Sequence, residues 1–342
     1  MHSFAMRPWT TAAVALLGAG AVAASPVVLP MPGAVAIDYM LAAENITLDL
    51  IRHGQSADNA EGVLGTLPPG APLTELGAEQ AAFLADPDNP QHLADPGFYD
   101  GIYASELIRS QLTAAGWLGG TDAPDSHVEI LAGLNEINAG WFEGKDLDTL
   151  TEIAYALPTF LWAMGLYWVP MLGSDIDPNG VAFNDRVTEA IDVIYNHSIA
   201  DEDNSLSNVA FAHAGTIAIW TLMNVKNPDF GLVLENLLDT HNPLVNTGQV
   251  IIEGNPTDGW TLVSWAGQEV AETPDLLTGL FVDWRDLNTA PQIAAWHILE
   301  ALQGGDPDEF AAALETGFNQ VVDAFAAFPQ AVIDTITGAL GD

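Results

Sequence analysis

Two basic side chains stand together near the start of the chain, directly after an apolar run. Arg52 and His53 follow the apolar-patterned segment 46–50 and precede Gly54. A strand over 46–52 would deliver both side chains to the carboxyl edge of a sheet, and the glycine would let a ligand approach the backbone. Imidazole is a nucleophile toward phosphorus, and a guanidinium binds phosphoryl oxygens bidentately. The pattern indicates phosphoryl chemistry. Three residues alone are a weak signal, so the interpretation depends on motifs elsewhere in the chain.

Further segments with chemically active side chains follow in a fixed order. They are Asn59, then Leu73-Thr74-x-x-Gly77-x-x-Gln80-Ala81, then Ser105-x-x-x-Arg109-x-x-x-Thr113-Ala114, then Leu134-Asn135-Glu136 with Gly140-Trp141-Phe142-Glu143-Gly144, and last His213-Ala214-Gly215-Thr216. With Arg52-His53-Gly54, these segments resemble the histidine phosphatase superfamily. They are most similar to branch 1, which includes phosphoglycerate mutases and broad-specificity phosphatases. The resemblance covers about residues 46–265 and is specific because the motifs keep their order.

The resemblance implies roles for six residues. The catalytic residues would be His53, Glu136 and His213. The phosphate-binding residues would be Arg52, Arg109 and Asn59. His53 would be the nucleophile that becomes phosphohistidine, and Glu136 the proton donor. No cofactor or metal is implied.

Physical chemistry supports these roles independently of the family. An in-line displacement at phosphorus needs positive donors around the equatorial oxygens. Two arginines and a second imidazole supply them without a metal. The departing alkoxide needs a proton, which a partly buried carboxyl group can donate and later take back. Glu136 is the candidate for that acid, with Glu143 or a residue of the segment 146–172 as the alternatives.

One residue departs from the pattern of the branch. Ala214 follows the second histidine where this branch commonly has glycine, whereas the other major branch has an acid there. An alanine cannot donate a proton at that position. The departure therefore favours Glu136 as the acid.

Basic residues are rare, so their positions carry weight. The chain has 7 Lys+Arg against 46 Asp+Glu, a formal net charge of −39, and no cysteine. The negative electrostatic field of such a chain repels nucleic acid and anionic lipid. The lack of cysteine excludes disulfides and thiolate catalysis. Outside the motifs, the basic residues are Arg7, Lys145, Arg186, Lys226 and Arg285.

This scarcity bears on the reaction. A mutase must hold a doubly anionic substrate, which favours additional Lys and Arg at the mouth of the site. We therefore predict a phosphomonoesterase that acts on a small-molecule phosphomonoester. The alternatives are a phosphoglycerate mutase-like phosphotransferase and a catalytically inactive envelope or binding protein.

The two ends of the chain suggest additional segments. Residues 1–24 resemble an export signal, with Arg7 before an apolar run and a small-x-small site at 21–23, and 25–45 would be a linker. The protein would be secreted or held in the cell envelope, although an uncleaved anchor is the alternative. A phosphatase domain would cover 46–270, with a helical insertion at 146–172, and a helical extension would cover 271–342.

The periodicity of the apolar residues predicts an α/β fold, a three-layer sandwich with a mostly parallel central sheet flanked by helices. The strands expected are 46–52, 102–104, 128–131, 209–212, 249–253 and 260–265. The helices expected are about 73–84, 107–117, 185–196, 292–303 and 308–340, the last broken at Pro329.

Two further patterns leave alternatives open. Residues 153–173 carry no charge, as in a membrane span, but Pro158 and Pro170 disfavour one continuous helix. We expect a helical flap, a contact with a membrane or apolar partner, or part of a homodimer interface. The run from Asp175 to Gly180 resembles the start of a calcium loop, but its twelfth position is Arg186, so a turn before a helix is the favoured interpretation.

Overall fold

The computed structural model describes residues 43–123, 125–200, 205–240 and 242–341. The predicted export signal and nearly all of the predicted linker lie outside these ranges. The described residues form one seven-stranded sheet with the order β3-β2-β4-β1-β5-β6-β7. Its strands are β1 (Ile46–Arg52), β2 (Gly101–Ala104), β3 (Glu129–Ile130), β4 (Ser207–Ala212), β5 (Gln249–Asn255), β6 (Gly259–Trp265) and β7 (Gln268–Glu269).

The sheet is mixed. Strands β3, β2, β4 and β1 pair in parallel, whereas β5, β6 and β7 continue the sheet through antiparallel pairings. Because β6 is antiparallel to β5 and β5 to β1, β6 runs in the same direction as β1. The expected α/β class is confirmed, and the parallel half is the part that carries the site.

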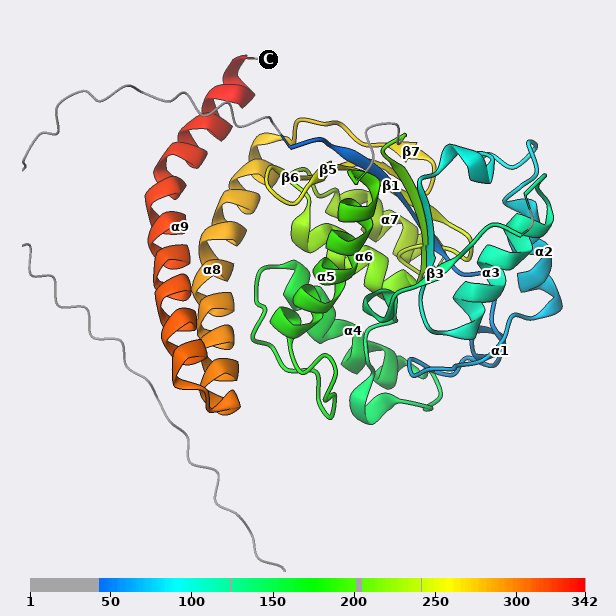
Figure 1. Ribbon diagram of the computed structural model, residues 1–342, viewed down its shortest axis with the longest axis horizontal. Coiled ribbons are helices and arrows are strands. Elements are labelled where there is room, and N and C mark those ends of the chain that lie inside the picture. The colour runs from blue at the N-terminus through cyan, green and yellow to red at the C-terminus, as the bar shows by residue number, and fades with distance from the viewer. Residues whose placement is uncertain (1–42, 124, 201–204, 241, 342) are drawn as a thin grey trace, which may run out of the picture. The chain divides into compact units, whose positions relative to one another are not determined.

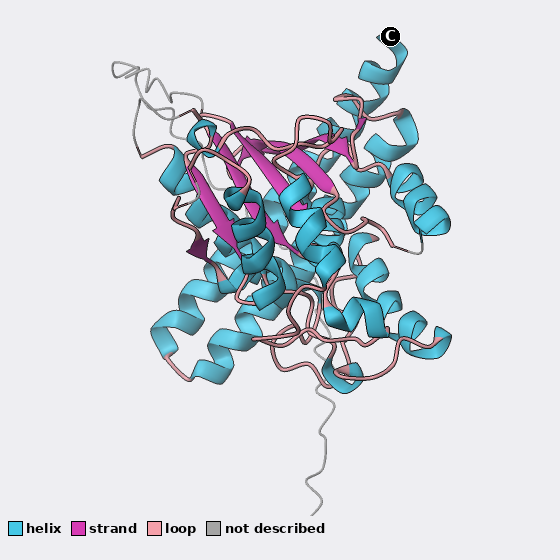
Figure 2. Ribbon diagram, turned by 90° about the vertical axis from the view of Figure 1, so that its right-hand side faces the viewer, coloured by secondary structure: helices cyan, strands magenta, loops and turns pink. Residues whose placement is uncertain are grey.

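Helices cover both faces of this sheet (Figures 1 and 2). They are α1 (Ala57–Glu61), α2 (Glu75–Phe83), α3 (Ile108–Gly119), α4 (Thr149–Ala163), α5 (Gly180–Ser198), α6 (Ala214–Asn224), α7 (Phe230–Thr240), α8 (Leu276–Gly304) and α9 (Pro307–Gly341). The helices and the sheet between them form three layers. Strand β4 contributes to the core on both sides of the sheet, since successive side chains of a strand point to opposite faces. Val209 and Phe211 pack in the core beneath α2 and α3, whereas Ala210 and Ala212 pack with α5 and α6.

Strand register places the two motif histidines side by side. Arg52, the last residue of β1, pairs with Ala212, the last residue of β4. His53 and His213 therefore leave the sheet at the same carboxyl edge. Ser105 leaves β2 at that edge too, and its amide donates to Phe211 O at 3.1 Å. Residues far apart in sequence meet here because parallel strands end together.

The segment 146–172 is largely helical, as expected. Helix α4 buries Trp162 completely, and the Trp162 indole donates to Val169 O at 2.8 Å, so this segment packs into the domain. Within the described ranges, no helix has both the length and the apolar character needed to cross a membrane.

The helices at the C-terminus differ from the expectation. Helix α8 begins at Leu276, well before residue 292, and the expected break at Pro329 is wrong because α9 continues through it. A proline inside a helix frees the carbonyl four residues earlier. Pro329 is exposed, so water can satisfy that carbonyl, and packing against α8 holds the long helix together.

Candidate active site

His53 is almost completely buried, with 3% of its surface exposed, where the chain leaves β1. Its Nδ1 lies 2.6 Å from Gly54 O, and its Nε2 lies 3.0 Å from Arg109 Nε. A carbonyl only accepts and a guanidinium only donates, so the proton is on Nδ1 and the lone pair is on Nε2. Burial, then Arg109 and Arg52, lower the pKa of His53 well below its ordinary value. The ring is therefore neutral, with its lone pair on a defined atom, Nε2.

His213 is fully buried and has the opposite tautomer. Its Nδ1 accepts from Arg109 Nε at 3.3 Å, so its proton is on Nε2, which lies 2.7 Å from Ser105 Oγ. The centroids of the His53 and His213 rings are 5.1 Å apart. Burial, followed by the charge of Arg109, lowers the pKa of His213 well below its ordinary value. Both imidazoles are therefore neutral.

Two arginines supply the positive charge of the site. Arg109, on α3, and Arg52, at the end of β1, are 3% and 5% exposed. Arg52 Nη1 donates to Leu244 O at 2.6 Å and to Asn242 Oδ1 at 3.2 Å. Burial lowers the pKa of Arg52 to about 10, so it remains a cation at neutral pH.

Some donors of these arginines are buried without a hydrogen bond. Within the described residues, Arg52 Nε and Arg109 Nη1 have no hydrogen-bond acceptor, and the nearest carboxylate to Arg109 Nη1 is Asp58 at 3.9 Å. A buried donor left unpaired costs about 1–3 kcal/mol, and more when it is charged. An anion bound between the two side chains would satisfy both groups.

Glu136 lies at the N-terminus of α6, directly beyond His213. Its Oε1 accepts from the amides of Ile137 and Thr216 at 3.0 and 2.9 Å and from Thr216 Oγ1 at 3.1 Å. Its Oε2 accepts one longer bond, from the Gly215 amide at 3.3 Å. Oε1 is therefore committed to the protein, and Oε2 is the oxygen that can exchange a proton with a ligand.

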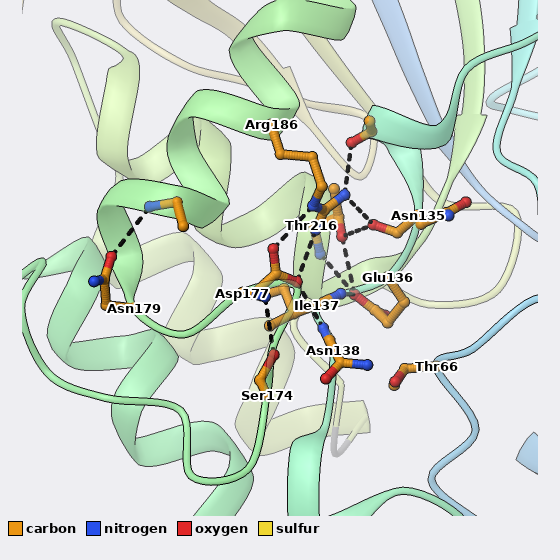
Figure 3. A network of polar contacts seen from close by, with 12 residues as sticks. Thr66, Asn135, Glu136, Ile137, Asn138, Ser174, Asp177, Asn179, Arg186 and Thr216 are labelled. Atoms are coloured by element: carbon orange, nitrogen blue, oxygen red, sulfur yellow. Dashed lines mark hydrogen bonds and ion pairs between the residues drawn. The ribbon is translucent and has the colours of Figure 1, made fainter. Parts of the chain in front are cut away.

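A buried ion pair supports the loop that carries Glu136 (Figure 3). Arg186 donates from Nε and Nη2 to both oxygens of Asp177, at 2.9 and 3.0 Å, and from Nη1 to the carbonyls of Gly133 and Asn135. Asp177 has no exposed surface and also accepts from the Asn138 amide at 2.8 Å. These bonds fix the backbone on both sides of Glu136.

The same contacts decide between the two interpretations of the run Asp175 to Gly180. Both oxygens of Asp177 are held by Arg186, and the Asn179 side chain caps the start of α5 by accepting from Val181 and Ala182. The turn before a helix is confirmed. The calcium-loop alternative is not supported, because both carboxylate oxygens of Asp177 accept hydrogen bonds from Arg186.

Comparison with known proteins shows the family. Residues 48–266 match the model of the histidine phosphatase superfamily (branch 1). The chain belongs to this superfamily. The predicted resemblance is confirmed.

Individual relatives share the sequence or the fold. The PE-PGRS family protein PE_PGRS11 of Mycobacterium tuberculosis is 42% identical over 306 residues, which is 87% of this chain and 49% of that protein. The chain thus spans about half the length of this relative. A mycobacterial glucosyl-3-phosphoglycerate phosphatase in complex with VO3 is 22% identical, with 65% of this chain and 98% of that chain covered and a TM-score of 0.45. A phosphoglycerate mutase from Bacillus anthracis is 19% identical, with 66% and 94% covered and a TM-score of 0.45.

Two of the candidate site residues are engaged in local contacts. Asn59 is exposed, and its Oδ1 accepts from the Ser56 amide at 3.3 Å and from Asn246 Nδ2 at 3.2 Å, which caps α1. Its phosphate-binding role stays a prediction. The Glu143 carboxylate accepts from Thr66 Oγ1 at 2.5 Å and from the amides of Thr66 and Leu67. Glu143 therefore holds a loop, which favours Glu136 as the acid.

Several contributors were not found by sequence reasoning. The loop before β5 brings Asn242 to Arg52 and Asn246 to His53 O, the latter at 3.0 Å, although it lies 190 residues away in sequence. Nothing in the spacing marks these asparagines as part of the site. Ser105 was noted only as part of a motif, and the structure shows its contact with His213.

Proposed function

We propose that this protein is a phosphomonoesterase that works through phosphohistidine at His53. The observation that carries the proposal is the tautomer of His53, because the Nδ1 bond to Gly54 O leaves the Nε2 lone pair beside the Arg109 guanidinium. A nucleophile aimed at a buried cationic group is suited to an anionic electrophile, and a phosphoryl group is one.

In the first step, Nε2 of His53 attacks phosphorus in line with the leaving oxygen. The N–P bond forms as the P–O ester bond breaks, and Glu136 Oε2 gives its proton to the departing alcohol. Arg52 and Arg109 neutralise the charge on the equatorial oxygens, with the donors that have no partner in the free site. His213 is not required as a base, since its Nε2 carries a proton and is held by Ser105.

In the second step, water attacks the phosphoryl group of phosphohistidine. Glu136, now a carboxylate, takes a proton from the water as the new P–O bond forms and the N–P bond breaks. Inorganic phosphate leaves, and His53 and Glu136 return to their starting states. The same carboxyl group acts as acid and then as base, so no other proton carrier is needed.

The location of the other basic residues supports hydrolysis over mutase chemistry. Arg186 is paired with Asp177, and Arg285 donates to the carbonyls of Leu222 and Val225 at the C-terminal end of α6, opposite to the end that holds Glu136. Lys226 directly follows that end of the helix. Arg285 and Lys226 thus lie at the far end of α6, and the guanidinium of Arg186 is engaged by Asp177, so these three of the four other cations in 43–341 do not serve a second anionic group.

The test is hydrolysis of p-nitrophenyl phosphate in EDTA by the wild type and by His53→Ala. We expect metal-independent turnover that is lost in the variant, because the two guanidinium groups supply the positive charge. Equal activity in both proteins would exclude His53 as the nucleophile, and loss of activity in EDTA would exclude the metal-independent route.

We also propose that the enzyme acts outside the cytoplasm, on the pattern of residues 1–24. Fractionation of the source cells would test this. Enzyme recovered only from the cytoplasm would contradict it.

A further inference from the structure

Helix α9 lies at the edge of the domain, packed along α8 (Figure 1). Small residues bring the two helices close together, since Gly317 lies against Ala294 and Ile298, and Gly279 lies against Thr335. The two helices therefore form an antiparallel hairpin. This hairpin uses only one face of α9.

A second face of α9 is apolar and exposed. We call it the α9 stripe, and it consists of Leu314, Phe318, Val322, Phe325, Ile333, Ile336 and Leu340. Their exposed fractions range from 39% for Ile336 to 80% for Leu340. At about 100° per residue, all seven fall within an arc of about 100° beside the face that packs on α8. A contiguous apolar surface of this kind marks an interaction site.

The charges on α9 restrict what can cover the stripe. The helix contains no Lys, Arg or His. Of its acidic residues, Glu309, Asp323 and Asp334 lie more than about a quarter turn from the centre of the stripe, whereas Asp308 and Glu315 border one edge of it. An anionic lipid surface would be repelled by this helix, and a partner that binds through its own acidic side chains would find no cation here to pair with. An uncharged apolar surface is the complementary partner, and the stripe itself is one.

We propose that the α9 stripe is the interface of a homodimer, in which the hairpins of two copies form a four-helix bundle. Seven large side chains that are on average about half exposed present on the order of 600–700 Å² of apolar surface, close to the about 800 Å² per partner of a stable interface. At the ends of the hairpin, α8 adds Leu277 and Leu302, which are 78% and 58% exposed. The same patch on both copies satisfies twofold symmetry.

The sequence match to a relative also extends beyond the family domain. The family match ends at residue 266, and the match to PE_PGRS11 covers 87% of this 342-residue chain, more than the 266 residues up to that point. Part of the segment beyond 266 is therefore shared with that protein. A shared segment outside the catalytic domain is consistent with a role in assembly.

Net charge predicts how salt affects the dimer. Each copy carries a formal charge of −39, so the two copies repel one another while the stripes attract. Screening weakens the repulsion and leaves apolar burial intact. Association through the stripe should therefore tighten as salt is raised, whereas a contact made by charge pairs would weaken.

Sedimentation equilibrium of the full chain tests the proposal, at low and at moderate salt. The wild type should be a dimer that tightens with salt. Phe318→Gln with Phe325→Gln should weaken the dimer by more than about a hundredfold, because these aromatic side chains lie at the middle of the buried surface. The matched control is Leu150→Gln with Leu157→Gln on α4, where the side chains are 76% and 52% exposed, and it should leave the dimer unchanged. Circular dichroism and phosphatase activity check that each variant is folded.

The cysteine-free sequence allows a second measurement. Val322 lies in the stripe, and its neighbour Asp323 points away from it; both are exposed. Under mild oxidation, Val322→Cys should form a disulfide-linked dimer and Asp323→Cys should not.

Three results would overturn the proposal. They are a monomer at all salt concentrations, a dimer unaffected by the stripe variants, and equal cross-linking of both cysteine variants. Co-sedimentation with neutral phosphatidylcholine vesicles distinguishes a dimer interface from a membrane-binding surface. If the protein is a monomer that binds the vesicles, and the stripe variants do not bind them, the stripe contacts a membrane instead.

Discussion

Glu136→Gln removes the proton that the proposed mechanism gives to the leaving alcohol, while it keeps the shape of the side chain. The amide oxygen of the glutamine can still accept from Ile137 N, Thr216 N and Thr216 Oγ1, as Glu136 Oε1 does. Only the 3.3 Å bond from the Gly215 amide to Oε2 is lost. We therefore expect a change in the free energy of unfolding of no more than about 1 kcal/mol.

The effect on catalysis should depend on the leaving group. For an alkyl phosphate such as glycerol 2-phosphate, loss of the general acid should lower kcat/KM by about 100- to 10,000-fold. For p-nitrophenyl phosphate the loss should be much smaller, because the phenolate leaves without a proton. Since kcat/KM reports the steps through the first irreversible one, it isolates formation of phosphohistidine from its hydrolysis.

Glu143→Gln is the matched control. The Glu143 carboxylate accepts from Thr66 and Leu67, so this variant should lose stability without a change in the ratio of the two kcat/KM values. If Glu136→Gln lowered kcat/KM equally for both substrates, or if Glu143→Gln changed the ratio, the assignment of the acid would be wrong.

Three other predictions follow from buried charges. Arg186→Met should cost about 3–5 kcal/mol in urea unfolding because it leaves Asp177 buried and unpaired; a cost below about 1 kcal/mol would contradict the network. Burial raises the pKa of Asp49 to about 6, so the folded state loses stability as the pH rises from about 4, where this carboxyl ionises in the unfolded chain, to about 6. Asp49→Asn should therefore stabilise the protein by about 2–3 kcal/mol at pH 7.5, and the gain should disappear as the pH falls below 4. The pKa values of His53 and His213 are lowered in the folded state, so neither ring should titrate near pH 6.5 by NMR. Below pH 6.5, each histidine should lower the free energy of unfolding by about 1.4 kcal/mol per pH unit, because it is protonated only in the unfolded chain. An NMR titration midpoint near 6.5 would refute this prediction.

The catalytic centre was predictable because its residues follow strand ends. His53 and His213 each come after an apolar run that the sequence marks as a strand, and the register of β1 with β4 brings them together. The cap of α2 was predictable for the same local reason, since Thr74 Oγ1 accepts from the Gly77 amide at 3.0 Å. Local patterns therefore located the groups that the proposed mechanism places around the phosphoryl group.

The support of the site was not predictable because it depends on long-range contacts. Arg186 and Asp177 are close in sequence, but both form hydrogen bonds with the backbone near Glu136, which lies about 40 residues before Asp177 in the chain. Helices α6 and α7 were missed. Helix α9 was expected to break at Pro329, since a proline weighs heavily in local propensity. Packing of a whole helix on a neighbour outweighs one such residue.

The most direct test of the account is to trap the covalent intermediate. Wild-type enzyme quenched within its first turnovers of an alkyl phosphate should carry one phosphoryl group on Nε2 of His53, stable to base and labile to acid, as located by mass spectrometry. Glu136→Gln should accumulate this species from p-nitrophenyl phosphate, because hydrolysis of phosphohistidine lacks its base. Active enzyme with no phosphoryl group on His53, or with one on another residue, would contradict the proposed mechanism.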